Sequence, residues 1–155
     1  MYHFLLNGKN EYVIIDNTRI YDGFKMKIHY QQEIENKMLI DKNRLDSMRI
    51  ELKMLLMKSQ HAPHDKMLAK EVESKNNELN VFQIGAKERA EQLAEKYENQ
   101  IWSQINQYIK EYGQENNFKV IFGAIGDGSI MYADESTDYT ENVLNFINSK
   151  YESGE

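Results

Sequence analysis

The 155-residue chain has no cysteine, one proline and eight glycines. Without cysteine it can form no disulfide, thiolate nucleophile or cysteine metal site. The absence of cysteine is compatible with either a reducing or an oxidising compartment. Proline and glycine are the residues that most often interrupt helices and strands, so their scarcity predicts long uninterrupted elements. No apolar run approaches the roughly 18 residues of a membrane-spanning helix.

The chain has no excess of basic residues. It contains 19 Lys and Arg and 25 Asp and Glu, which gives a formal net charge of −6. Residues 127–155 carry seven acidic side chains and one lysine, so this segment accounts for the whole excess. A nucleic-acid-binding protein normally has a basic face, and we therefore expect no nucleic-acid partner. The opening residues MYHFLL are too short and lack the basic start of a signal peptide. If the protein is exported, we expect its signal to have been removed.

The middle of the chain predicts two long helices, at about residues 18–60 and 64–115, that form an antiparallel hairpin. Pro63 disfavours a helical conformation at Ala62, so the hairpin tip is expected near residues 58–66. Each helix carries apolar residues three or four positions apart, as a helix packed along one face does. These residues are Ile20, Phe24, Ile28, Leu45, Met48, Leu52 and Leu55 on the first helix, and Leu79, Phe82, Ala86, Ala90, Leu93, Tyr97, Ile101, Ile105, Tyr108 and Tyr112 on the second.

The two ends of the chain predict short strands. Tyr12–Asp16 is expected as a strand buried on both faces, with Asn17 or Thr18 capping the helix that follows. The segments FKVIF and SIMYA predict two more strands, and Asp138 or Thr140 is expected to cap a last helix at about residues 140–151.

The predicted fold class is therefore α+β, with residues 18–115 as a helical arm inserted into a body made of residues 1–17 and 116–155. Three short strands and one small helix make a marginal core for a single chain. We expect the strand regions of several chains to combine, which predicts an oligomer. The residues expected at the oligomer contact are Val13, Ile14, Ile15, Val120, Ile121, Phe122, Ile130, Met131 and Tyr132.

The glycine-rich segment with Gly123, Gly126 and Gly128 is interpreted as a hairpin turn. A dinucleotide-binding fingerprint reads G-x-G-x-x-G and opens a helix, whereas here the order is G-x-x-G-x-G and a strand is expected next. His61 and His64 could hold a metal ion weakly, but a solvated hairpin end is the favoured interpretation. We expect no catalytic residue, no cofactor and no metal site.

The predicted hairpin tip carries a cluster of large apolar residues. Four lysines lie nearby in residues 53–70. Some of the apolar residues are expected to close the hairpin end, and the others to form a soft binding surface, since methionine adapts to unlike partners. Such a tip suits an unfolded acidic or amphipathic polypeptide, or peripheral contact with a membrane surface. The candidate binding residues are Met54, Leu55, Leu56, Met57, Met67 and Leu68.

The passage IMYADESTDYTENVL, together with YVIIDNTRIYDGF near the start, resembles the Skp/OmpH family of periplasmic chaperones. The resemblance implies a homotrimer whose β body joins three chains and whose three helical arms enclose a cavity. It also implies a periplasmic protein that holds unfolded outer-membrane proteins without ATP. The acidic net charge departs from the basic character common in the family, so no lipopolysaccharide site is carried over.

A coiled-coil scaffold protein of the cell envelope, binding one fixed partner, is the alternative. A scaffold needs a continuous apolar seam along its helices, whereas a chaperone needs interrupted seams and adaptable surfaces. The gap in the first helix around Asp41 and the methionine cluster favour the chaperone.

Overall fold

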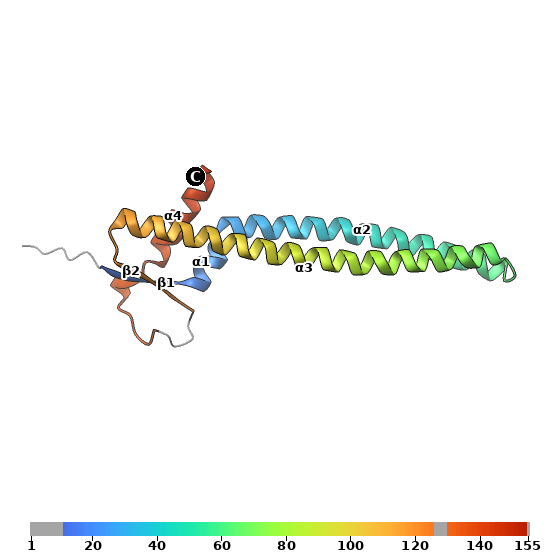
Figure 1. Ribbon diagram of the computed structural model, residues 1–155, viewed down its shortest axis with the longest axis horizontal. Helices are drawn as coiled ribbons and strands as arrows, with labels where there is room; N and C mark the ends of the chain where they lie inside the picture. Colours follow the sequence, from blue (N-terminus) through green and yellow to red (C-terminus); the bar gives the residue numbers. More distant parts are fainter. Residues whose placement is uncertain (1–10, 126–129, 155) are drawn as a thin grey trace, which may run out of the picture. The chain divides into compact units, whose positions relative to one another are not determined.

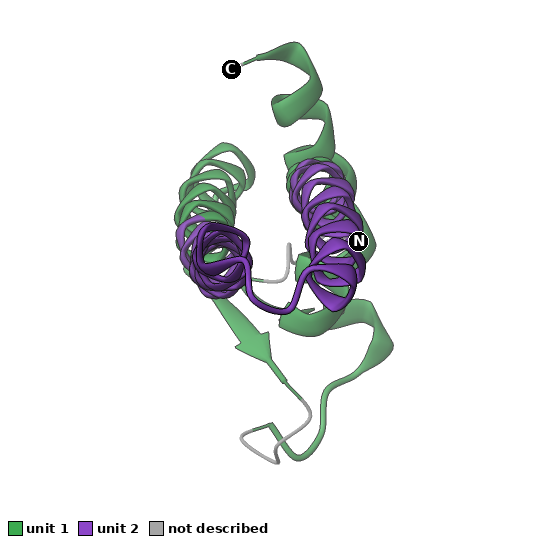
Figure 2. Cartoon of the chain, turned by 90° about the vertical axis from the view of Figure 1, so that its right-hand side faces the viewer, with its two compact units in different colours: residues 1–30, 97–155 green, residues 31–96 purple. Residues whose placement is uncertain are grey.

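The structure, a computed structural model, describes residues 11–125 and 130–154. Two compact units are present, and both long helices contribute to both of them (Figure 2). The terminal unit contains the chain up to Tyr30 and from Tyr97 onward, and the hairpin unit is Gln31–Lys96. Figure 1 shows the elements, which are β1 (Tyr12–Asp16), α1 (Asn17–Gly23), α2 (Lys25–His61), α3 (Lys66–Asn116), β2 (Val120–Ala124), the 3₁₀ turn η1 (Glu135–Thr137) and α4 (Thr140–Ser153).

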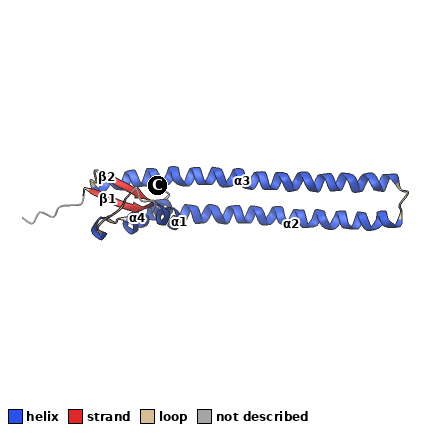
Figure 3. Ribbon diagram, turned by 90° about the horizontal axis from the view of Figure 1, so that it is seen from below, coloured by secondary structure: helices blue, strands red, loops and turns tan. Residues whose placement is uncertain are grey.

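The sheet of the terminal unit consists of β1 and β2, which pair in parallel (Figure 3). Their register runs from Tyr12 opposite Val120 to Asp16 opposite Ala124. A parallel pair needs a long crossover connection, which the helices provide here. Burial alternates along β1, where Val13 and Ile15 are buried and Tyr12 is exposed. The expectation of a strand buried on both faces is therefore wrong, because the described residues cover only one face completely.

The predicted third strand at Ile130–Tyr132 does not form. Met131 and Tyr132 are 89% and 83% exposed. A strand needs a hydrogen-bonded neighbour, and the second edge of β1 is used by the segment before α4, where the Tyr139 N–H donates to the Ile14 carbonyl at 2.9 Å. No further edge of β1 is left for residues 130–132 within this chain.

Gly123 lies inside β2, opposite Ile15, and not in a turn as predicted. A Cβ atom at this position would come within 2.8 Å of the Asn17 side chain, so the glycine makes room for that asparagine. Gly126 and Gly128, the rest of the predicted turn, lie outside the described residues.

The predicted first helix is divided in two at Phe24, whose backbone is extended. The Asn148 side chain on α4 replaces the interrupted helical bonds. Its oxygen accepts from the Lys25 N–H at 2.8 Å and its amide donates to the Gly23 carbonyl at 3.1 Å. The break shifts the helical phase, so Met26 is buried and Ile28, which the sequence placed on the apolar stripe, is 45% exposed.

The core of the terminal unit joins α1, α3 and α4 to the sheet. The α3 stripe predicted from the sequence is confirmed, since its residues from Tyr97 to Tyr112 are buried. Phe24 is fully buried and meets Tyr108 and Tyr151 in edge-to-face contacts with ring centroids 6.3 and 5.6 Å apart. The fully buried side chains other than Phe24 are Val13, Ile15, Ile20, Ile105, Thr140, Val143 and Ile147.

Asp16, and not Asn17 or Thr18 as predicted, caps α1. Its Oδ1 accepts hydrogen bonds from the backbone N–H groups of Thr18 and Arg19 at 2.9 and 3.0 Å. These groups have no partner within the helix, so an acceptor side chain at this position stabilises it.

Replacing Asp16 with alanine should lower the free energy of unfolding by about 1 kcal/mol, because two helix-end donors lose their acceptor. Urea unfolding at fixed protein concentration, followed by fluorescence of Trp102, measures this change, since Trp102 stacks on Tyr21 of α1. Thr18→Ala is the matched control, with an expected change within about 0.5 kcal/mol. A larger loss in the control than in Asp16→Ala would contradict the capping role of Asp16.

Candidate functional site

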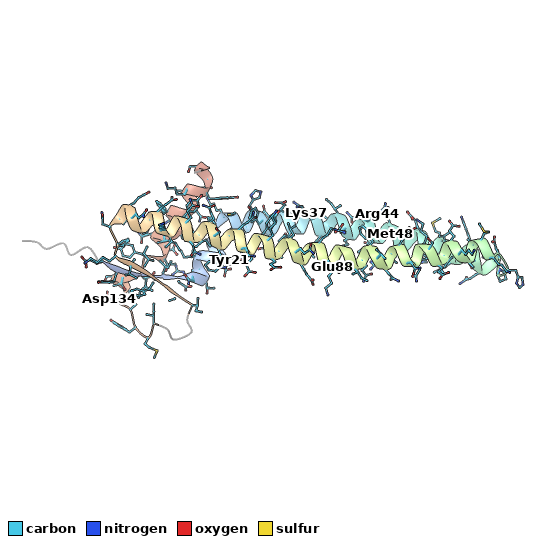
Figure 4. The ribbon with its side chains drawn as sticks, in the orientation of Figure 1. Tyr21, Lys37, Arg44, Met48, Glu88 and Asp134 are labelled. Atoms are coloured by element: carbon cyan, nitrogen blue, oxygen red, sulfur yellow. The ribbon has the colours of Figure 1, made fainter. Side chains whose placement is uncertain are left out.

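The hairpin unit consists of antiparallel segments of α2 and α3. Two ion pairs fix this direction, because Asp41 meets Arg89 at 3.2 Å and Glu51 meets Lys75 at 3.7 Å. The predicted apolar spacing on α2 is confirmed, since Leu45, Met48, Leu52 and Leu55 are all partly buried. Figure 4 labels Met48 on α2 within this seam.

The end of the hairpin unit is a short turn between His61 and Lys66. Asp65 caps α3 there, with its Oδ1 accepting from the N–H groups of Met67 and Leu68 at 2.9 and 3.0 Å. The cap holds the start of α3 in a defined position, and with it the side chains of Met67 and Leu68.

The structure separates the six candidate binding residues into two sets. Leu55 and Leu68 are partly buried. The other four project into solvent, and helix geometry explains why. Consecutive helical residues are about 100° apart, so the run from residue 54 to residue 57 surrounds α2 and cannot face α3 as a whole. The exposed fractions are 57% for Met54, 45% for Leu56, 52% for Met57 and 77% for Met67.

Charged side chains surround this exposed cluster. Lys53, Lys58, Lys66 and Lys70 are all exposed. A groove on α3 is lined by Asp65, Met67, Leu68, Lys70, Glu71, Ser74, Lys75 and Glu78. A hydrogen bond from Lys75 to Glu78 raises the pKa of the lysine above its ordinary value. The surface therefore combines apolar thioether and leucine side chains with ammonium groups.

The two histidines at the turn, His61 and His64, are exposed. Within residues 11–125 and 130–154, no three His, Cys, Asp or Glu side chains gather as a metal site would require. In the same residues, no helix combines the length and apolar character needed to cross a membrane.

A second apolar surface lies further along the hairpin unit, and the sequence analysis did not identify it. A groove of about 190 Å³ is lined by Ile34, Lys37, Met38, Ile40, Asp41, Arg89, Ala90 and Leu93. It forms opposite the small Ala90, where Asp41 interrupts the seam and binds Arg89. The signal in the sequence was the run Met38, Leu39 and Ile40, because three consecutive apolar residues cannot all face one partner helix; all three are exposed.

The predicted oligomer contacts divide into three sets. Val13 and Ile15 belong to the core of their own chain, so they are not free for a second copy. Ile14, Ile121 and Ile130 are partly buried. The exposed members of the set are Val120, Phe122, Met131 and Tyr132.

Comparison with known proteins identifies the family. A sequence model of the family described as "Outer membrane protein (OmpH-like)" matches residues 11–147. The chain belongs to the OmpH-like family. A candidate outer membrane chaperone (OmpH-like) from Caulobacter crescentus CB15 has a similar crystal structure, with a TM-score of 0.78 and 13% sequence identity. The likeness covers 92% of this OmpH-like chain and 86% of the other.

That likeness shows a shared fold. It confirms the α+β class predicted for this OmpH-like protein, with long helices inserted between short strands. Among curated proteins, none matches this sequence.

Proposed function

We propose that this OmpH-like protein is an ATP-independent holdase chaperone, which binds unfolded outer-membrane proteins in a cavity between the helical arms of a homotrimer. The observation that carries the proposal is the exposure of Met54, Leu56, Met57 and Met67 at the end of a folded helical hairpin. Membership of the OmpH-like family supports a chaperone role, and so does the fold shared with a candidate outer membrane chaperone.

The chemistry of the hairpin end suits an unfolded polypeptide better than one fixed partner. Methionine side chains are flexible and polarisable, so they pack against apolar side chains of many shapes. The surrounding lysines attract acidic residues of the same client segment. Each contact is weak, and several arms acting on one client add their effects through a high effective concentration.

The free edge of β2 supports the proposed assembly of several chains. Within the described residues, β2 pairs only with β1, and its exposed Val120 and Phe122 lie beside the unpaired edge. An unpaired edge readily accepts a strand from another chain. We place the segment Ile130–Tyr132 of a neighbouring copy along it, which would give this segment a strand partner that it does not have among the described residues.

We also propose that the protein acts in the periplasm, because outer-membrane proteins cross that compartment unfolded. Peripheral contact of the hairpin end with a membrane surface is a further part of it, supported by the lysines beside the exposed methionines.

Two measurements test the proposed function. Sedimentation equilibrium should give a mass of about 55 kDa, three times the 18.3 kDa of one chain. The purified trimer, in several-fold excess and without nucleotide, should keep a β-barrel membrane protein from aggregating when urea is diluted away. A monomer in solution would contradict the trimer, and undiminished aggregation would contradict the chaperone activity.

A further inference from the structure

We propose that Met54, Met57 and Met67 form a methionine-oxidation site that switches the end of the hairpin unit from an apolar to a polar surface. A peroxide is the reagent, and methionine sulfoxide is the product. The effect on client binding rests on the proposed function, whereas the modification itself does not.

The exposure of these three thioethers sets them apart from the other sulfur atoms of the hairpin seam and the core. Their side chains are 52–77% exposed, whereas Met26 is 9% exposed in the core and Met48 is partly buried between the two helices. Oxidation of methionine requires access of the oxidant to sulfur. The oxidation rate should therefore be higher at the three exposed methionines than at Met26 and Met48.

Cysteine is absent, so all sulfur in the chain is in its eight methionines. No thiolate, normally the first target of a peroxide, competes for the oxidant or protects the thioethers. Met54, Met57 and Met67 therefore place three oxidisable groups within the exposed apolar cluster at the hairpin end. Met38 is a fourth exposed thioether of this unit, but it lies beside the Asp41 groove and not at the hairpin end.

The reaction is a two-electron oxygen transfer. A lone pair on the thioether sulfur attacks one oxygen of hydrogen peroxide, an S–O bond forms and the O–O bond breaks. The departing hydroxide takes the proton of the transferred oxygen, which gives methionine sulfoxide and water. Sulfur loses two electrons and the peroxide gains them.

The product changes the surface in one defined way. A sulfoxide is a polar hydrogen-bond acceptor, so it stays hydrated and no longer favours contact with apolar side chains. Because the three side chains already face solvent, the helices themselves should keep their packing. We expect affinity for an unfolded client to fall about tenfold, since each methionine that stays in water forfeits part of its burial energy. Methionine sulfoxide reductases reverse the reaction, so the loss should be reversible.

The test treats the purified protein with dilute hydrogen peroxide and measures oxidation at each methionine by peptide mass spectrometry. Met54, Met57 and Met67 should oxidise at least several-fold faster than Met26 and Met48. Equal rates at all of these positions would overturn the proposed site, whatever the function of the protein.

Affinity for an unfolded β-barrel protein is then measured before treatment, after treatment and after enzymatic reduction. The variant M54L/M57L/M67L has an apolar surface that cannot be oxidised there, so whatever affinity it has before treatment should be unchanged after treatment. The matched control M38L should lose binding as the unsubstituted protein does. Unchanged binding by the oxidised protein would overturn the switch.

The two measurements distinguish failure of the proposed function from failure of the proposed oxidation site. If the untreated protein does not bind the client, the chaperone proposal is contradicted, and the site-resolved oxidation rates still decide the modification site. The oxidation rate at Met131 is an independent test of the proposed trimer. It is 89% exposed in the single chain and should oxidise slowly only if a neighbouring copy covers it.

Discussion

Replacing Met54, Leu56, Met57 and Met67 together with serine should lower affinity for an unfolded outer-membrane protein by about tenfold or more. Burying a whole methionine or leucine side chain contributes about 1.5–3 kcal/mol, and these four are between 45% and 77% exposed in the free protein. Even if a client covers only part of them, the summed loss exceeds the 1.4 kcal/mol of a tenfold change. Titration of a labelled, urea-diluted β-barrel protein measures the affinity.

The helices should remain intact in this variant, because it leaves Leu55 and Leu68, the partly buried members of the cluster, unchanged. V81S/I84S is a suitable control, since Val81 and Ile84 are exposed apolar residues of α3 away from the turn. We expect that control to change the affinity less than twofold. If both variants weaken binding equally, client contacts are spread along the hairpin unit, and the assignment to its end is wrong.

Phe24→Ala should lower the free energy of unfolding by about 3–5 kcal/mol, the range for removing a buried aromatic ring. Phe24 is fully buried and its ring contacts Tyr108 on α3 and Tyr151 on α4. It also occupies the break between α1 and α2, so its loss leaves a cavity where three helices meet. Urea unfolding followed by circular dichroism and by Trp102 fluorescence measures the effect.

Ile40→Ala is the matched control for Phe24→Ala, because Ile40 is a large apolar residue of α2 that is 67% exposed. Its expected effect is within about 0.5 kcal/mol. A loss below about 1 kcal/mol in Phe24→Ala would show that the break at Phe24 is not held by packing in the terminal unit.

The sequence prediction failed at three places in the terminal unit, and only some of these failures have a local cause. The break at Phe24 is held by Asn148, which lies on α4 more than a hundred residues away. The cap of α1 was assigned one or two residues too late, because strand and helix propensities do not show where the backbone changes direction. The segment at Ile130–Tyr132 has the composition of a strand but pairs with no strand among the described residues.

The candidate site was predicted in part. The sequence located the methionine-rich cluster at the hairpin end, but it could not tell Met54 from Leu55. Which of two neighbouring residues faces solvent depends on the rotation of α2 against α3. The groove beside Asp41 was missed for the same reason, since it exists only where a small residue on one helix meets an interrupted seam on the other.

The sequence by itself determined the two long helices, the apolar stripe of α3, the strand at Tyr12–Asp16 and the family. These features depend on residues close together in the chain, whose spacing repeats with the period of a helix or a strand. The tertiary structure alone decided the break at Phe24, the pairing of β1 with β2 and which apolar side chains remain in water. Those outcomes depend on which surfaces meet, because a side chain is buried only when a residue elsewhere in the chain covers it.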